Sequence, residues 1–238
     1  MTAATATIVT IGNELVSGDV PNTNAPWLAK RLARLGVSVR LVAEIPDELD
    51  AIAELIRAQA AHVDVVVVTG GLGGTPDDVT REALAHTFGV PQVELPELAA
   101  ELRERFRGDP DYVTPWAALP QGARPLRNPL GGAPGFAIEN VYVLPGLPGE
   151  MEAMFLTLEE ELRRGSPIDA WRHVYRTRES AIASALVECG ERWPGVLVGS
   201  YPTFGDGGPT VEVVLKSSDP AELAAASAWL AAAIEERG

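Results

Sequence analysis

The stretch of sequence that decides the fold is residues 63–82, which read VDVVVVTGGLGGTPDDVTRE. Its first six residues are almost continuously β-branched, which is typical of a strand covered on both faces. The glycines at 70–74 form a turn, and the pattern after them predicts a helix over residues 76–88, with Thr75 as its cap and Pro76 as its first residue. A buried strand, a glycine loop and a helix in this order predict one unit of an α/β fold.

Strands and helices alternate on both sides of this stretch. Strand patterns cover residues 6–11, 37–45 and 141–144, and helical patterns cover residues 24–36, 49–56 and 148–164. This alternation predicts βαβ crossovers and a mostly parallel sheet with helices on both sides.

The last third of the chain has a different order of elements. Gly165-Ser166-Pro167 is interpreted as a boundary between two domains, residues 1–165 and residues 168–238. After it we expect a strand (173–177), a helix (179–192), two strands (196–200 and 210–216) and a final helix (220–236), which predicts a small α+β domain. Residues 90–128, with a helix expected at 98–106, are interpreted as an excursion over the first sheet.

Composition and charge exclude several classes of function. The 238 residues carry a formal net charge of -14, which disfavours nucleic acids and anionic membranes as partners. Cys189 is the only cysteine, so no intrachain disulfide can form and a reducing compartment is expected. No signal peptide and no membrane-spanning run of residues is recognised, which predicts a soluble cytoplasmic protein. An anionic ligand would have to be held by backbone dipoles, arginines or a cation.

Three strand ends are expected to face one crevice. Gly12–Asp19, Asp47 and Gly70–Asp78 each follow a strand, and ligands of such sheets bind beyond the carboxyl ends of the strands. Clustered glycines let backbone N–H groups approach an anion. The same loop can also be explained as ordinary helix-start chemistry, in which Asp77 and Asp78 favour the helix dipole.

A phosphate in this loop would face two carboxylates, and their repulsion would cost several kcal/mol at close range. A divalent cation between them resolves the conflict, and oxygen ligands suit magnesium or manganese. The hypothesis is that Asp78 holds such a cation with help from Asp47 or Asp77. Asp47 alone is also explained as a common helix cap, and the Gly12–Gly18 segment as a turn.

Two proline- and glycine-rich stretches, residues 128–136 and residues 144–151, are either rigid turns or the walls of a pocket. Other constellations are missing, because the three histidines have no metal-ligand spacing and no Gly-x-Ser-x-Gly elbow exists. Cys189 is expected in the core. Trp116 is interpreted as a packing residue that could alternatively stack on a base.

The combination resembles the MoaB/Mog molybdopterin-binding family, and more closely the amino-terminal domain of the CinA-type proteins. The stretches that carry the resemblance are Gly12–Gly18 with Thr23-Asn24, Pro46-Asp47, Thr69–Glu82, Asn128–Phe136, Leu144–Met151 and Gly199–Pro202. The resemblance implies a three-layer α/β/α domain followed by a small α+β domain. It also implies a homo-oligomer, either a dimer or a trimer.

The resemblance implies two alternative activities. CinA-type domains resemble metal-dependent pyrophosphatases that act on ADP-ribose, with a divalent metal (Mg, Mn or Co) and potassium as an activator. Mog-type relatives bind molybdopterin and adenylylate it with Mg-ATP, through two aspartates that match Asp47 and Asp78. The carboxy-terminal domain of many CinA proteins, a nicotinamide-nucleotide amidohydrolase, has no counterpart in this chain.

We therefore predict a metal-dependent hydrolase of a dinucleotide pyrophosphate, with a molybdopterin-binding or adenylylating protein as the second hypothesis and a non-catalytic ligand-binding module as the third. The expected catalytic residues are Asp47, Asp78 and Glu14, and the expected metal ligands are Asp78, Asp47 and Asp77. The residues expected to bind the ligand and its phosphate are Gly12, Asn13, Ser17, Asn24, Gly70, Gly71, Leu72, Gly73, Thr75, Thr80, Pro145 and Gly146.

Three positions depart from the pattern of the resemblance. Gly74 replaces a proline of the glycine loop, and Asn22 stands where an aspartate is usual. Trp116 stands about where many relatives have a glutamine. These changes leave Asp47 and Asp78 in place but affect the expected metal affinity and ligand choice.

Overall fold

The structure is a computed structural model that describes residues 4–205 and 207–235. The chain divides into two compact units. One contains the described residues up to Leu32 and Ser38–Arg163, and the other contains Ala33–Val37 and the chain from Arg164 onward. Each unit has its own hydrophobic core and is described by itself.

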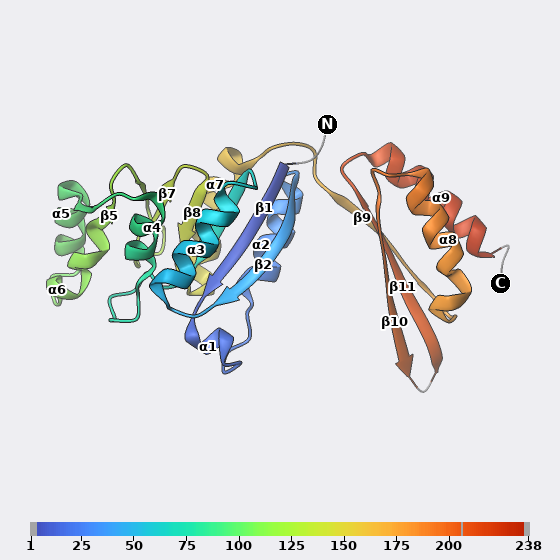
Figure 1. Cartoon of the computed structure of the whole chain (residues 1–238), viewed down its shortest axis with the longest axis horizontal. Helices are drawn as coiled ribbons and strands as arrows, with labels where there is room; N and C mark the ends of the chain where they lie inside the picture. The colour runs from blue at the N-terminus through green and yellow to red at the C-terminus, as the bar shows by residue number, and fades with distance from the viewer. Residues whose placement is uncertain (1–3, 206, 236–238) are drawn as a thin grey trace. The chain divides into compact units, whose positions relative to one another are not determined.

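The first unit is built on a six-stranded sheet with the order β2-β1-β3-β8-β7-β6 (Figure 1). The strands are β1 (Ala4–Ile11), β2 (Val37–Ile45), β3 (Val65–Thr69), β8 (Val141–Leu144), β7 (Gly135–Ile138) and β6 (Arg124–Leu126). At its centre β3 pairs in parallel with β1 and β8, whereas β7 pairs antiparallel with β8 and with β6. The sheet is therefore mixed, and β7 is a strand that the sequence did not predict, since residues 128–136 were interpreted as rigid turns or pocket walls.

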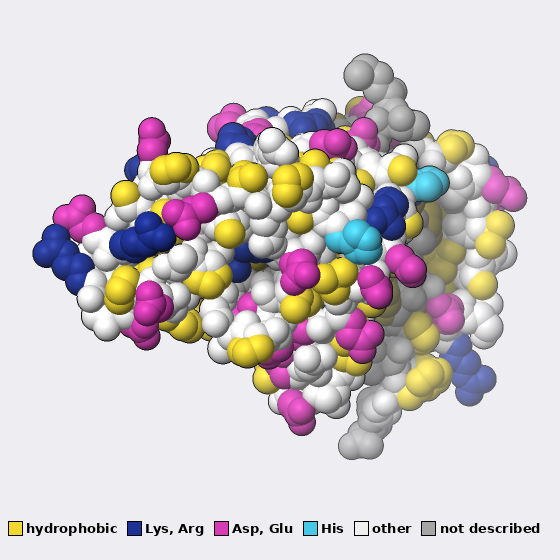
Figure 2. All heavy atoms as spheres, turned by 60° about the vertical axis from the view of Figure 1, so that its left-hand side comes forward, with side chains coloured by type: hydrophobic (Ala, Val, Ile, Leu, Met, Phe, Trp, Pro, Cys, Tyr) yellow, Lys and Arg dark blue, Asp and Glu magenta, His cyan; other side chains and the backbone are white. Residues whose placement is uncertain are grey.

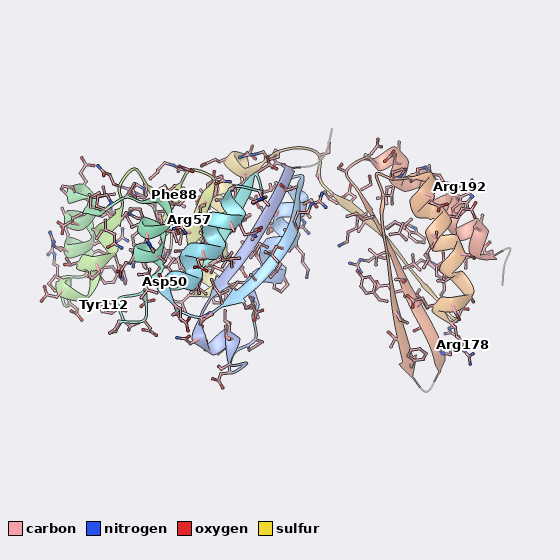
Figure 3. The ribbon with its side chains drawn as sticks, in the orientation of Figure 1. Asp50, Arg57, Phe88, Tyr112, Arg178 and Arg192 are labelled. Atoms are coloured by element: carbon pink, nitrogen blue, oxygen red, sulfur yellow. The ribbon has the colours of Figure 1, made fainter. Side chains whose placement is uncertain are left out.

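Helices cover both faces of this sheet. The five residues of β3 are all buried, because successive side chains point to opposite faces and each face is covered. Val66 and Val68 pack in one cluster with Ile52 and Ile56 of α3 (Leu49–Ala60) and with α4 (Thr80–Phe88). Arg57 of α3 also donates hydrogen bonds to the last carbonyls of α4 (Figure 3).

The opposite face is covered by α2 (Asn24–Arg34) and α7 (Pro148–Leu162). Their rings Trp27 and Phe155 meet edge to face with centroids 5.6 Å apart, and Arg31 forms an ion pair with Glu159. The three-layer α/β/α architecture is thus confirmed. A short helix, α1 (Asn13–Val16), follows β1.

The segment between α4 and β6 forms the expected excursion. It contains β4 (Gln92–Glu94), α5 (Pro96–Arg105), α6 (Pro110–Val113), the 3₁₀ turn η1 (Thr114–Ala117) and β5 (Ala118–Pro120). β4 and β5 pair antiparallel, and residues of α5, α6 and η1 join the core cluster of the main sheet. The excursion therefore packs on the first unit instead of forming its own core.

The second unit has the order strand, helix, strand, strand, helix that the sequence predicts. Its elements are β9 (Asp169–Tyr175), α8 (Glu179–Arg192), β10 (Leu197–Gly205), β11 (Gly208–Ser217) and α9 (Pro220–Glu235). The antiparallel sheet has the order β10-β11-β9, and both helices pack on one of its faces (Figure 1). Cys189 is fully buried there, as predicted. Glu236, the expected end of the last helix, lies outside the described residues.

Two further findings concern the whole chain. None of the helices within the described ranges combines the length and the apolar character that a membrane span requires. Figure 2 shows acidic side chains distributed over the face that it presents, with basic side chains among them.

Candidate functional site

A pocket of about 520 Å³ lies beyond the ends of β1, β2, β3 and β8. A volume of this size is typical of small-molecule sites. The ends of β1 and β2 are tied together by a hydrogen bond of 3.1 Å from Gly12 N to the Ile45 carbonyl. A bond of 3.2 Å from Gly70 N to the Leu144 carbonyl ties β3 to β8 in the same way. The three segments that the sequence directed to one crevice do share a cavity.

The pocket brings together most of the residues expected in the site. Those that line it are Gly12, Glu14, Asn24, Asp47, Gly70, Gly71, Leu72, Gly73, Asp77, Asp78, Pro145 and Gly146. The remaining four of the expected ligand-binding residues, Asn13, Ser17, Thr75 and Thr80, are not part of its lining. The hydroxyl of Ser17 instead bonds to the carboxylate of Asp19 at 2.6 Å.

The glycine loop folds around the side chain of Asp78. Gly73 N donates to Asp78 Oδ1 at 2.8 Å, and Thr75 donates to Asp78 Oδ2 from its N at 2.8 Å and from its hydroxyl at 2.6 Å. Helix α4 consequently begins at Thr80, and the prediction of a helix start at Pro76 with Thr75 as its cap is wrong. A carboxylate that reaches back to backbone N–H groups offers the chain an alternative to the first turn of a helix.

These bonds change which loop amides can bind a ligand. The amides of Gly73 and Thr75, which were expected to hold a phosphate, donate to Asp78 in this structure. The amides of Gly71 and Leu72 have no acceptor among the residues that the structure describes, and both residues line the pocket. Thr80, which was expected to bind the ligand, is buried, and its hydroxyl donates to the Gly70 carbonyl at 3.0 Å.

A buried arginine donates hydrogen bonds to the glycine loop. Arg81 is 5% exposed and donates to the carbonyls of Leu72 at 2.6 Å and Gly73 at 3.3 Å. Burial lowers the pKa of its guanidinium to about 10, while the carboxylate of Asp78 acts in the opposite direction. Arg81 was not among the expected site residues, although its position three residues after Asp78 places both side chains next to the same turn.

Asp47 and Asn13 are joined by two hydrogen bonds. Asn13 N donates to Asp47 Oδ2 at 2.9 Å, and Asp47 N donates to Asn13 Oδ1 at 3.3 Å. Burial raises the pKa of the Asp47 carboxyl, the Asn13 amide lowers it, and the carboxylates of Glu14, Asp77 and Asp78 raise it further. The second oxygen, Asp47 Oδ1, faces Gly71, since a Cβ built there would lie 3.5 Å from it.

Two asparagines that line the pocket make different contacts. Asn22 Oδ1 accepts from Ala25 N at 3.0 Å and therefore supports the first turn of α2. Asn24 instead donates to the Thr69 hydroxyl at 3.1 Å and to the Gly146 carbonyl at 2.8 Å. Its Oδ1 is buried without a donor among the described residues, and Asn24 lines the pocket.

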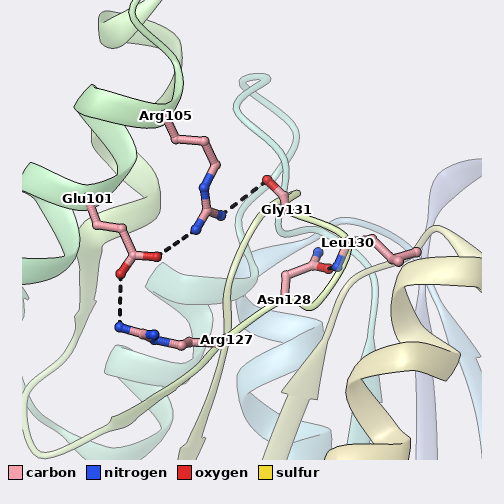
Figure 4. Close-up of polar contacts among 6 residues, drawn as sticks. All are labelled: Glu101, Arg105, Arg127, Asn128, Leu130 and Gly131. Carbon is pink, nitrogen blue, oxygen red and sulfur yellow. Dashed lines mark hydrogen bonds and ion pairs between the residues drawn. The ribbon is translucent and has the colours of Figure 1, made fainter.

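The proline- and glycine-rich loops form one wall of the pocket. Gly132, Ala133 and residues 145–148 line it, together with Glu150, which accepts from Asn128 Nδ2 at 2.8 Å. Figure 4 shows the polar contacts between α5 and this wall. Arg105 donates to the Gly131 carbonyl and pairs with Glu101, which also accepts from Arg127. These loops are walls, and not only rigid turns. Glu150 was missed as a site residue.

An aromatic corner forms another part of the lining. Trp116 of η1 contacts Phe106 edge to face at 5.3 Å between centroids and Tyr112 of α6 at 5.6 Å. Tyr112 lies against the glycine loop, because a Cβ at Gly74 would lie 2.8 Å from the Tyr112 ring. The glycine at 74 therefore has a packing reason, which the sequence comparison alone did not reveal.

The acidic side chains of the pocket do not form a metal cage by themselves. In the described ranges, no group of three or more His, Cys, Asp or Glu side chains is placed to hold a metal ion. The expected ligand set of Asp47, Asp77 and Asp78 is therefore not assembled in this structure. Magnesium often takes only one or two carboxylates and completes its shell with ligand phosphates and water. The residues fit a cation that enters together with a phosphate ligand.

Fold and pocket define the class of protein: a three-layer α/β/α domain with an acidic, ligand-sized pocket at its strand ends, followed by a small α+β domain. The chain belongs to the family of the probable molybdopterin binding domain, whose model matches residues 7–164. Residues 172–238 match the middle domain of FAD synthase. The resemblance to MoaB/Mog-type and CinA-type proteins is thus confirmed.

Individual relatives agree with this assignment. A protein of Pyrobaculum calidifontis is 42% identical over 83% of this chain and 80% of its own length. A CinA-like protein of Frankia casuarinae is 39% identical over 91% of this chain, which covers 55% of that protein. Among solved structures, the protein CinA of Thermoplasma acidophilum is 34% identical, matches 67% of this chain and 99% of its own, and has a TM-score of 0.63.

Proposed function

We propose that this protein is a metal-dependent hydrolase that cleaves the phosphoanhydride of ADP-ribose or a similar dinucleotide pyrophosphate. The observation that carries the proposal is the joint presence, in one pocket, of the Asp47 carboxylate and of the Gly71 and Leu72 amides, which have no acceptor among the described residues. Amide donors suit a phosphate, but the neighbouring carboxylates repel it unless a cation enters as well. A divalent metal, when bound, neutralises the pyrophosphate and activates water.

The residues of the chain would divide the work as follows. The Gly71 and Leu72 amides bind phosphate oxygens, and Asn24 Oδ1 accepts from a ligand hydroxyl or a bound water. Asp47 is the base, because its raised pKa makes it a better proton acceptor than an ordinary aspartate. The oxygen of the attacking water bonds to one phosphorus while the bond from that phosphorus to the bridging oxygen breaks. ADP-ribose and water then yield AMP and ribose 5-phosphate.

Asp78 takes a different part from the one that the sequence suggested. Both of its carboxylate oxygens already accept hydrogen bonds from the glycine loop. It therefore acts on catalysis by holding the loop in the conformation that presents the Gly71 and Leu72 amides. Glu14 and Asp77, whose carboxylates add negative charge beside Asp47 in the same lining, are the better candidates for direct contact with a cation.

The test is turnover of ADP-ribose by the whole chain with Mg²⁺, Mn²⁺ or Co²⁺, with and without K⁺, followed by chromatography of AMP. We expect release of AMP that requires the metal and falls about 10²–10⁴-fold in Asp47→Asn. Ser17→Ala is the matched control, because Ser17 lies outside the pocket lining, and it should retain the rate. Absence of metal-dependent turnover, or equal rates for both variants, would contradict the proposal.

A second candidate function is favoured by one observation, the match of residues 7–164 to a probable molybdopterin binding domain. In that case the same pocket would hold the phosphate of molybdopterin, and Mg-ATP would donate an adenylyl group to it. Incubation with molybdopterin and Mg-ATP should then yield an adenylylated pterin and pyrophosphate. Tight binding of either ligand without turnover would instead indicate a non-catalytic binding module. The expected homo-oligomer, a dimer or trimer, is a separate proposal that light scattering can test.

A further inference from the structure

The pocket is lined by side chains of two chemically different kinds. Glu14, Asp47, Asp77 and Asp78 supply carboxylates, whereas Tyr112 and Trp116 supply aromatic rings to the same lining. A volume of about 520 Å³ exceeds what a phosphate group with a cation needs and suits a nucleotide-sized ligand. The part of the lining formed by Tyr112 and Trp116 therefore has no ligand group assigned to it yet.

Trp116 carries an unpaired donor. Its side chain is 5% exposed, and its indole Nε1 is buried with no acceptor among the residues that the structure describes. A buried donor without a partner costs about 1–3 kcal/mol, so native proteins rarely keep one without a reason. Trp116 lines the pocket, and a ligand acceptor that reaches this N–H after a local shift of the lining would remove this cost.

Tyr112 supplies an accessible ring beside this donor. It is 44% exposed and meets Trp116 at 67° between ring planes, so the two rings form a corner and not a stack. Figure 3 shows Tyr112 on α6, close to the loop that precedes α4, and the contact with Gly74 joins the ring to the glycine loop. The aromatic corner and the amides of Gly71 and Leu72 are thus parts of one continuous lining.

We propose that Tyr112 and Trp116 form the subsite for a planar nitrogen heterocycle of the ligand, which stacks on Tyr112 and accepts a hydrogen bond from the Trp116 N–H. Ring nitrogens and carbonyls of nucleobases and pterins are suitable acceptors, and their π-faces stack on aromatic side chains. This inference rests on the proposed function for the position of the phosphate. It adds a second group of the ligand that the pocket recognises.

The experiment compares ligands with and without the heterocycle. AMP, ribose 5-phosphate and 6-hydroxymethylpterin are titrated calorimetrically into the whole chain with Mg²⁺. Trp116→Phe keeps a ring but removes the N–H, and should weaken AMP about 5–10-fold while leaving ribose 5-phosphate unchanged. Tyr112→Leu, at an exposed position that should tolerate the change, should weaken AMP about 10-fold. Trp193→Phe in the second unit is the matched control and should have no effect.

The outcomes separate cleanly. Equal weakening of AMP and ribose 5-phosphate, no effect of either variant on the heterocycle that binds, or no binding of either AMP or the pterin to the wild type would overturn the subsite. If circular dichroism shows that one variant does not fold, the other variant is tested by the quenching of its tryptophan fluorescence by AMP. Weaker binding of AMP by that variant, with unchanged binding of ribose 5-phosphate, supports the proposal. Binding of the pterin but not of AMP would show that the subsite binds a pterin and not a nucleobase. AMP selectivity without hydrolysis of ADP-ribose supports the subsite while rejecting the proposed reaction.

Discussion

Asp47 and Asp78 line the same pocket, yet their replacement by asparagine should change the stability of the protein in opposite directions. Asp78 accepts three hydrogen bonds from its own loop, and these bonds stabilise the folded loop. Asp47 is dominated by burial and by neighbouring carboxylates, which disfavour its ionised form. Asp78→Asn should therefore destabilise the protein, and Asp47→Asn should stabilise it.

The magnitude for Asp78 follows from its partners. Asparagine keeps one acceptor oxygen, so its amide group must face either the Gly73 amide or the two donors of Thr75. At least one hydrogen bond to a charged group is lost, which costs about 1.5–3 kcal/mol. Relief of repulsion with nearby carboxylates offsets about 0.5 kcal/mol. We expect a net loss of about 2 kcal/mol, and a fall in Tm of about 4–8 °C.

The expected change in stability for Asp47→Asn is smaller and has the opposite sign. Asparagine at 47 keeps an oxygen that can accept from Asn13 N, so the bond of 2.9 Å survives. The charge, whose burial and repulsion raise the pKa of this carboxyl, is removed. Because Asp47 is only half-buried, we expect a gain of about 0.5 kcal/mol.

The assay is calorimetric unfolding of the wild type and both variants at neutral pH with EDTA, so that no divalent metal contributes. Both variants should lose hydrolytic activity when metal is restored. The two variants then share the loss of activity and differ only in their stability. An Asp78→Asn variant that unfolds at or above the Tm of the wild type would refute the reasoning. It would mean that the loop does not depend on the Asp78 carboxylate.

Three further outcomes are expected. Gly71→Ala should cost about 1–3 kcal/mol in urea unfolding, because its φ is +64° and a Cβ would collide with the Thr80 hydroxyl, whereas Gly89→Ala (φ +65°, open space) should cost less. Arg81→Lys should cost about 1–3 kcal/mol, since a lysine cannot reach both loop carbonyls, and unchanged unfolding would contradict this role. The gain from Asp47→Asn should be largest at neutral pH. It should shrink as the pH falls through the raised folded pKa and disappear below the ordinary value of 3.8, because both states of the wild type are then protonated.

Much of the fold was predictable because it depends on local patterns. Continuous β-branched residues at 65–68 predict a strand buried on both faces, and all of β3 is buried. The alternation of strands with helices predicts the layers, and the order of elements after Gly165 predicts the second unit. The common location of Asp47 and Asp78 was also predictable, because strand ends of a parallel sheet meet at one edge.

Local patterns misled where a side chain competed with the backbone. The start of α4 is displaced from Pro76 to Thr80 because Asp78 captures the amides of its own loop. Helix α2 receives its side-chain bond from Asn22, whereas Asn24 Nδ2 donates to the Gly146 carbonyl. Neither outcome follows from the spacing of residue types, because each depends on which partner lies nearest after folding.

By itself, the sequence determined the class of the fold, the family and the edge of the sheet at which a ligand would bind, because these depend on periodicity and on chain order. Only the tertiary structure decided what each group does there. Asp78 organises the loop, Asp47 keeps one oxygen without a loop donor, and the Trp116 N–H has no partner among the described residues. Hydrogen bonds form over about 3 Å, so their partners are set by contacts between segments far apart in the chain.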